Sequence, residues 1–228
     1  MAEQDLIGKV IFERLQQEKA DKIARFRYLN EFVKKGQIVF AGSSLMEQFP
    51  IYEFIQDFDL PYTIYNRGVG GFTTTEMIDA LRETVYDLSP RYLFLNIGTN
   101  DLNGSDYSKE ALIDRYDLIL RAIEENVPGI KIYLMAYYPV NPDCADNPWM
   151  VRTLQLRTNE RIAEANEAVK VLASKHNAQF IDVNNVIADD NGNLKSEYTV
   201  DGMHMYANGY RQILDALLPI LKTINSDS

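Results

Sequence analysis

The chain has 228 residues, of which 46% are hydrophobic and 25% are charged, a length and composition typical of one folded globular domain. A formal charge of −10 would repel phosphate backbones and anionic headgroups, which argues against nucleic acid as a partner. The sequence starts without a basic segment followed by an apolar one, and no run approaches the roughly 18–20 apolar residues that span a bilayer. With Cys144 as the single cysteine, these features predict a cytoplasmic protein without stable membrane insertion.

Apolar and β-branched runs alternate with amphipathic segments along the chain, which predicts strands that alternate with helices. The first expected element is one long or broken helix over about residues 6–35, which ends near Gly36. Strands are expected at residues 38–41, 63–66, 92–97, 131–136 and 179–183. Further helices are expected at residues 75–85, 109–125, 149–176 and 207–221. This alternation favours an α/β fold, a three-layer α/β/α sandwich with a five-stranded parallel sheet.

The chain shows no repeat, low-complexity tract or linker, so most of it is expected to form one domain. We assign residues 37–228 to this domain and residues 1–36 to an N-terminal helical extension. The extension has more apolar positions than a solvent-exposed helix needs. We therefore expect it to pack on the domain or to help form a homodimer.

Small, polar and charged residues follow four of the predicted strands. Ligands of open parallel sheets bind beyond the carboxyl ends of the strands. The first three strands are followed by GSSL (residues 42–45), RGVGG (67–71) and GTND (98–101), and the segment after the fifth strand contains DGMH (201–204). We expect all four to converge on one rim of the sheet, which makes that rim the candidate active site.

These segments contain every group that ester cleavage needs: a hydroxyl, a base held in one tautomer, and fixed donors for a charged oxygen. Ser44 lies where a strand turns into a helix, which presents its Oγ atom. His204 is the candidate base, and Asp201, three residues earlier, can accept a hydrogen bond from its other ring nitrogen. The Gly70-Gly71 pair lets a backbone N–H approach a ligand closely, and Asn100 offers a side-chain amide.

In this order, GSSL, NRGVGG, GTND and DGMH resemble the four blocks that define the SGNH/GDSL hydrolases. The chain looks most similar to the branch of platelet-activating-factor acetylhydrolase and bacterial lysophospholipase-like proteins, from the first strand to the last helix. The resemblance implies an SGNH/flavodoxin-like fold and carboxylic-ester hydrolysis of a small molecule, with no cofactor and no metal. It further implies Ser44 as nucleophile, His204 as base and Asp201 as its orienting partner. The implied oxyanion hole combines the backbone N–H groups of Ser44 and Gly71 with the side chain of Asn100.

The first block departs from the family pattern, which usually reads Gly-Asp-Ser and here has Ser43 at the Asp position. In the family this Asp supports hydrogen bonds around the nucleophile, so its replacement bears on catalytic efficiency more than on mechanism. Ser43 stays an alternative nucleophile. Four residues at the predicted rim are expected to contact the substrate: Ser43, Leu45, Tyr138 and Met203.

Two other functions compete with ester hydrolysis. The chain could bind a ligand without turnover, if the replacement at Ser43 has weakened the site. A dinucleotide-binding loop is a poor fit, because the Gly-x-Gly-x-x-Gly pattern that starts at Gly68 reaches Thr73 at its last position. With only two histidines and one cysteine, the chain has few of the side chains that usually bind zinc.

Overall fold

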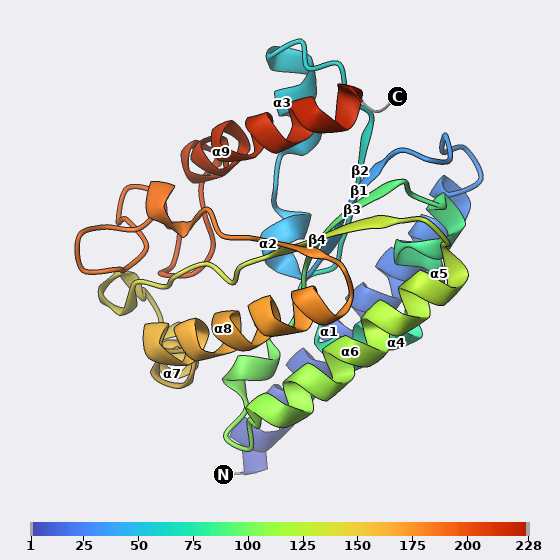
Figure 1. The fold of residues 1–228 in the computed structure, drawn as a ribbon. Helices are drawn as coiled ribbons and strands as arrows, with labels where there is room; N and C mark the ends of the chain where they lie inside the picture. The colour runs from blue at the N-terminus through green and yellow to red at the C-terminus, as the bar shows by residue number, and fades with distance from the viewer. Residues whose placement is uncertain (1, 227–228) are drawn as a thin grey trace.

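A five-stranded parallel sheet forms the centre of the computed structural model, which describes residues 2–226 and the side chains of residues 8–224 (Figure 1). The strands are β1 (Ile38–Gly42), β2 (Ile64–Gly68), β3 (Tyr92–Asn96), β4 (Lys131–Met135) and β5 (Gln179–Ile181). All neighbours pair in parallel in the order β2-β1-β3-β4-β5. The predicted fold class is confirmed.

The strand order places the motif segments. β1 lies between β2 and β3, so the chain leaves β1 toward one edge of the sheet and later crosses to its other side. In open α/β sheets such a reversal opens a crevice at the carboxyl ends of the two strands beside it, here β1 and β3. These strands lead directly into the GSSL and GTND segments. The crevice is therefore the place where the first and third motifs meet.

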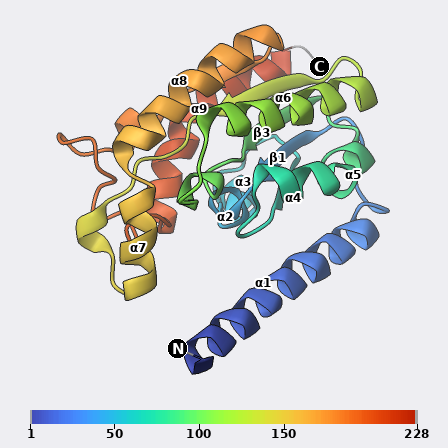
Figure 2. The ribbon, with the colours of Figure 1, turned by 90° about the horizontal axis from the view of Figure 1, so that it is seen from below.

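Helices cover both faces of the sheet (Figures 1 and 2). One face packs against α1 (Ala2–Leu29), α4 (Thr74–Asp79), α5 (Leu81–Thr84), α6 (Lys109–Asn126) and α8 (Asn159–Lys175). The other face packs against α2 (Ser44–Glu47), α3 (Ile51–Asp57) and α9 (Ala207–Ser226). A shorter helix, α7 (Pro148–Leu156), precedes α8.

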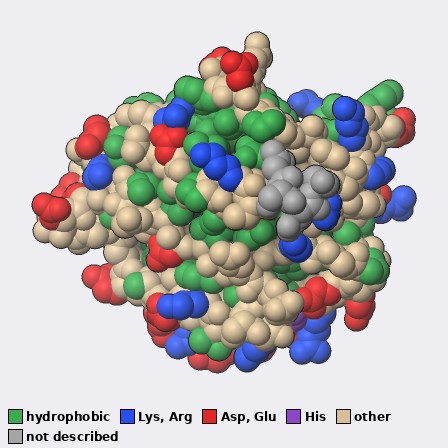
Figure 3. Space-filling model, turned by 45° about the horizontal axis from the view of Figure 1, so that its top comes forward, with side chains coloured by type: hydrophobic (Ala, Val, Ile, Leu, Met, Phe, Trp, Pro, Cys, Tyr) green, Lys and Arg blue, Asp and Glu red, His purple; other side chains and the backbone are tan. Residues whose placement is uncertain are grey.

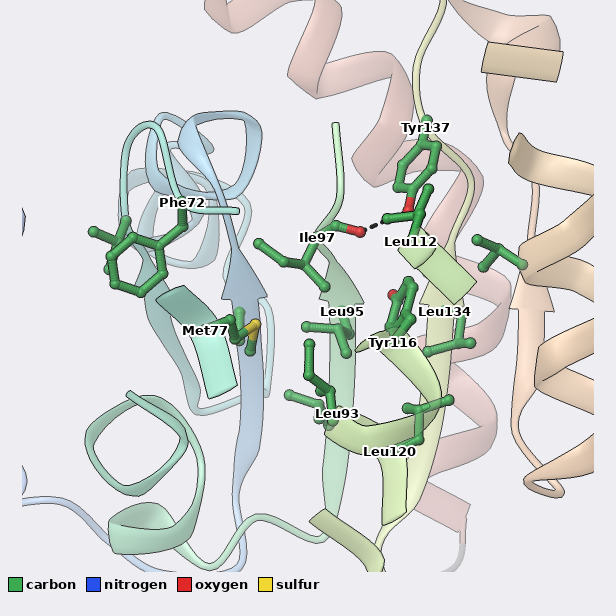
Figure 4. Close-up of a cluster of buried hydrophobic side chains, with 14 of the residues drawn as sticks. Phe72, Met77, Leu93, Leu95, Ile97, Leu112, Tyr116, Leu120, Leu134 and Tyr137 are labelled. Carbon is green, nitrogen blue, oxygen red and sulfur yellow. Dashed lines mark hydrogen bonds between the residues drawn. The ribbon is translucent and has the colours of Figure 1, made fainter. Parts of the chain in front are cut away.

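Alternate side chains of each strand enter two separate apolar clusters, as the twofold period of a strand requires. In β1, Val39 and Ala41 point into the first cluster, whereas Ile38 and Phe40 point into the second. The first cluster is drawn in Figure 4, where Leu95 of β3 lies between the side chains of α4 and α6. Because both faces are buried, the strands read as nearly continuous apolar runs in the sequence.

The predicted helix over residues 149–176 is in fact two helices, α7 and α8. The chain leaves the helical conformation at Arg157, and the hydroxyl of Thr158 accepts a hydrogen bond from the N–H of Arg161 at 3.2 Å. This N-cap starts a new helix without any glycine or proline at the break. The sequence prediction missed it because such caps are weaker signals than helix breakers.

Helix α1 is unbroken and ends at Leu29, earlier than the predicted end near Gly36. Its later part packs on the domain: Phe26 is buried in the first cluster, and Asn30 just beyond the helix accepts two hydrogen bonds from Arg67 at 2.9 and 3.1 Å. Its earlier part carries four exposed apolar side chains: Val10, Ile11, Phe12 and Leu15. Met1 and residues 227–228, which the predicted segments 1–36 and 37–228 include, lie outside the described residues.

Charges of both signs are interspersed on the face of the molecule in Figure 3, so the net negative charge is not gathered into one patch there. Over residues 2–226, no helix is both long enough and apolar enough to cross a lipid bilayer.

Candidate active site

Ser44 is presented by a tight turn between β1 and α2. Gly42, the last residue of β1, has a φ of +150°, and a Cβ atom there would lie 2.0 Å from the carbonyl oxygen of Asn96. Only glycine fits this approach, so the turn into α2 depends on it. The half-buried Ser44 is the first residue of α2, and its Oγ atom lies 3.0 Å from Nε2 of His204. The turn therefore delivers the hydroxyl directly to the predicted base.

His204 is held by Asp201 through two hydrogen bonds, and a third joins Asp201 to Met203. Its Nδ1 atom lies 2.7 Å from Oδ2 of Asp201, while Oδ1 accepts from the backbone N–H groups of His204 at 2.8 Å and of Met203 at 3.0 Å. An ionised carboxylate only accepts hydrogen bonds, so Nδ1 carries the ring proton. The Nε2 lone pair then faces Ser44, the arrangement required for a general base.

Asp201 is suited to stay ionised beside this ring. Burial alone would raise the pKa of Asp201, but the hydrogen bonds from the His204 ring and from the two backbone N–H groups outweigh it. The net result is a pKa below the ordinary value of 3.8 for this carboxyl. A carboxylate at this position stabilises the positive charge that forms on the imidazole when it takes a proton.

A hydrogen bond joins the two segments that carry the predicted oxyanion donors Asn100 and Gly71. Asn100 follows β3, and its Nδ2 atom donates to the carbonyl oxygen of Phe72 at 2.9 Å, which joins the GTND segment to the glycine-rich loop. Gly71 in that loop has a φ of +72°, a left-handed conformation that favours glycine. Among the described residues, no acceptor is recorded for the N–H of Gly71 or for a second N–H of Asn100.

Asp101, next to Asn100, fixes the glycine-rich loop from the other side. Its carboxylate accepts from the backbone N–H of Thr74 at 3.0 Å and from the Thr74 hydroxyl at 2.5 Å. Arg115 of α6 donates to the same carboxylate at 3.1 Å. These bonds hold the start of α4, and with it the loop that contains Gly71, at a fixed distance from Asn100.

Helix α1 reaches this loop through Lys19. Its Nζ atom donates to the carbonyl oxygen of Gly71 at 2.9 Å and to Oε1 of Glu76 at 2.6 Å. Glu76 also forms a capping box with Thr73 at the start of α4. Burial would raise the pKa of Glu76, but the hydrogen bonds from Lys19 and Thr73 and the charge of Lys19 together lower the pKa below 4.5.

Replacing Glu76 by glutamine is expected to lower the free energy of unfolding by about 1 kcal/mol at pH 7, because the cap and the ion pair weaken together. A carboxyl with a lowered pKa stabilises the fold above its unfolded-state pKa and loses that contribution as the pH falls through the folded-state pKa. The difference in unfolding free energy between wild type and Glu76→Gln should therefore shrink as the pH drops below 4.5, the ordinary pKa of a glutamate carboxyl. Urea unfolding at pH 7 and pH 3 measures this. The exposed Glu167 supplies a control, since Glu167→Gln should change little at either pH.

The four predicted substrate contacts are nearly covered in this structure. Ser43 is 0% exposed, and its hydroxyl lies 3.2 Å from the Thr99 hydroxyl. Leu45 and Tyr138 are buried in the second apolar cluster, and Met203 is buried in the first. A role for these side chains in binding substrate stays a prediction.

Sequence reasoning missed one group beside the site, Arg157, whose guanidinium donates to Oδ1 of Asn100 at 3.0 Å. The two residues are 57 positions apart, and no motif marks Arg157. Within the part of the chain that the structure describes, no cluster of three or more His, Cys, Asp or Glu side chains could hold a metal ion.

A model described as the GDSL-like lipase/acylhydrolase family matches residues 53–212, which include the last three motif segments. Platelet-activating factor acetylhydrolase IB subunit alpha2 of Rattus norvegicus is 23% identical over 186 residues, 81% of this chain and 75% of the rat protein. N-acylneuraminate cytidylyltransferase of Escherichia coli O18:K1:H7 is 26% identical over 195 residues, 85% of this chain. The matched region spans only 42% of that bacterial protein.

A solved structure from Streptococcus pneumonia, provisionally described as a platelet activating factor, superposes with a TM-score of 0.84 at 28% identity. The superposition covers 95% of this chain and 99% of the streptococcal chain.

Proposed function

Because the chain belongs to the GDSL-like lipase/acylhydrolase family of carboxylic-ester hydrolases, in its platelet-activating-factor acetylhydrolase-like branch, we propose that it cleaves a short-chain ester through an acyl-serine intermediate. The observation that carries the proposal is the continuous line of contacts from Ser44 through His204 to Asp201. A hydroxyl, a correctly protonated imidazole and an ionised carboxylate in this order form the machinery of serine hydrolases.

In the first half-reaction, Ser44 Oγ attacks the ester carbonyl while Nε2 of His204 takes the hydroxyl proton. The tetrahedral intermediate collapses when the C–O bond to the alcohol breaks, and the imidazolium returns the proton to the departing alcohol. Asp201 stays ionised and balances the imidazolium charge. In the second half-reaction His204 takes a proton from water, the hydroxide attacks the acyl carbon, and Ser44 is released with its proton restored.

The developing charge on the carbonyl oxygen needs fixed donors. We assign this role to the backbone N–H groups of Ser44 and Gly71 and to the second N–H of Asn100. The support is that Asn100 is locked to the glycine-rich loop through Phe72, so the two segments cannot separate without breaking a hydrogen bond. Donors that are oriented before the reaction need no reorganisation in the transition state.

A short acyl group suits the surroundings of the hydroxyl. Ser43, Leu45 and Met203, which flank Ser44 and His204 in the chain, are all at most 4% exposed. Because these three side chains present almost no accessible surface, they supply no apolar lining for a long acyl chain beside the nucleophile. The acetylhydrolase name of the rat relative points to the same size of acyl group.

A fluorophosphonate probe tests the nucleophile assignment. One equivalent should attach covalently to Ser44, identified by mass spectrometry of the labelled peptide, because labelling needs an activated hydroxyl. A series of p-nitrophenyl esters should then show turnover that declines from acetate to longer acyl chains. No labelling at Ser44, or labelling at another serine, would contradict the proposal.

The second candidate function is ligand binding without turnover. It is favoured by one observation: Ser43 stands at the acidic position of the family motif, and its uncharged hydroxyl lies 3.2 Å from the Thr99 hydroxyl. The labelling experiment separates the two functions, because a protein that only binds would show neither labelling nor turnover. Homodimer formation and a cytoplasmic location stay predictions.

A further inference from the structure

Arg157 is a buried cation next to the candidate active site. It lies at the break between α7 and α8 and is 2% exposed. Burial lowers the pKa of Arg157 to about 10, while the negative charges of Asp201 and Asp101 oppose this shift. The guanidinium therefore remains positively charged at neutral pH.

The guanidinium contacts groups from two motif segments and from the loop between them. Its Nη2 atom donates to Oδ1 of Asn100 at 3.0 Å, and its Nε atom donates to Oδ1 of Asn103 at 2.9 Å. Its Nη1 atom contacts the sulfur of Met203, which precedes His204 in the chain. Among the described side chains, Arg157 forms no ion pair with a carboxylate. Its charged guanidinium instead donates to the amide oxygens of Asn100 and Asn103.

These contacts determine which way the Asn100 amide points. An amide can turn over so that its oxygen and nitrogen exchange places, and the two orientations have nearly the same shape. Arginine has only donors, so the end of the amide that faces Arg157 must be the oxygen. The carbonyl of Phe72 has only lone pairs, so the other end must be the nitrogen. Arg157 and Phe72 together exclude the turned-over form.

The orientation matters because the two ends of the amide act oppositely on an oxyanion. The NH₂ group stabilises a negative oxygen, whereas the carbonyl oxygen would repel it. A cation bonded to Oδ1 also draws electron density away from the NH₂ group, which strengthens it as a donor. The orientation and the donor strength of the amide lower the energy of the complex only when negative charge develops on the substrate oxygen.

We propose that Arg157 is a positioning residue for ester hydrolysis, which holds Asn100 with its NH₂ group toward the oxyanion and increases the donor strength of that group. This inference rests on the proposed function. It assigns to Arg157 an effect on the transition state and none on binding of the uncharged ester.

The test measures kcat and KM for p-nitrophenyl acetate in the full chain carrying Arg157→Met. We expect kcat to fall about 10- to 100-fold with KM nearly unchanged, because the lost interaction supports only the transition state. Arg157→Lys keeps a charge and a donor but not the two-pronged geometry, so it should recover part of kcat. Circular dichroism and thermal melting show whether each variant is folded.

Two controls separate positioning from general loosening. Arg161 also reaches the loop after GTND, donating to the carbonyl of Leu102 at 2.8 Å, but it does not touch Asn100. Arg161→Met should therefore leave kcat within about threefold of wild type. In an Asn100→Ala background, Arg157→Met should lower kcat little further, because the amide through which Arg157 acts is already gone.

The outcomes distinguish this inference from the function on which it rests. Equal turnover by wild type and Ser44→Ala would overturn the proposed function itself. If Ser44→Ala is inactive but folded Arg157→Met and Arg157→Lys keep wild-type kcat, the inference about Arg157 is wrong. Fully additive losses with Asn100→Ala, or a rise in KM at constant kcat, would likewise overturn it.

Discussion

Replacing Ser44 by alanine is expected to lower kcat for p-nitrophenyl acetate by at least about 10⁴-fold, because the reaction loses the oxygen that forms the acyl intermediate. The neighbouring Ser43 cannot take over, since its side chain is fully buried and its hydroxyl faces Thr99. The residual rate should come from the oxyanion donors and His204 acting on water. Initial rates at saturating substrate, with purified wild type assayed in parallel, measure the loss.

Ser43→Ala is the matched control, because it removes the same atom from the adjacent position. It should keep kcat within about tenfold of wild type, the range expected for one weakened buried hydrogen bond. A folded Ser44→Ala protein that turns over the ester at the wild-type rate would refute the mechanism. A severe loss in Ser43→Ala with normal activity in Ser44→Ala would transfer the nucleophile role to Ser43.

Replacing Asp201 by asparagine is expected to lower kcat by about 10⁴-fold while the fold stays intact. The asparagine oxygen can still accept from the backbone N–H groups of Met203 and His204. Its NH₂ group then faces Nδ1, so the ring places its lone pair at Nδ1 and its proton at Nε2. In that tautomer Nε2 cannot accept the Ser44 proton, and base catalysis stops.

Asp190→Asn provides the comparison for Asp201→Asn, because Asp190 is exposed and the exchange removes the same charge. It should leave kcat unchanged within error. Imidazole proton signals in the NMR spectrum would report the tautomer of His204 directly. Near-normal kcat in a folded Asp201→Asn protein would show that Asp201 does not orient the ring.

The sheet and the positions of the motifs could be predicted from the sequence because both depend on local patterns. Strands buried on both faces appear as short apolar runs, and the first three motif segments follow those runs directly. The boundaries were less accurate: the break at Arg157 depends on a threonine cap, and α1 ends at Leu29, just before Asn30 bonds to distant residues of the domain. Neither feature has a strong local signature.

The environment of the candidate site was harder to predict than its members. Ser44, Asp201 and His204 lie in recognisable motifs, whereas Arg157 joins Asn100 only through the folding of distant segments. The same applies to Lys19, which meets Gly71 from the far end of the chain. Such partners are set by three-dimensional packing, which no spacing rule in a single sequence encodes.

Helix α1 lies outside residues 53–212, the part that defines family membership, yet it holds the loop of a proposed oxyanion donor. A protein trimmed to begin at β1 would keep Ser44 but lose the Lys19 contact at Gly71 and empty the site now filled by Phe26. Emptying a cavity of that kind destabilises a domain by about 3–5 kcal/mol. An expression boundary for this chain should therefore lie before α1, because the matched region alone would omit the helix that holds the Gly71 loop.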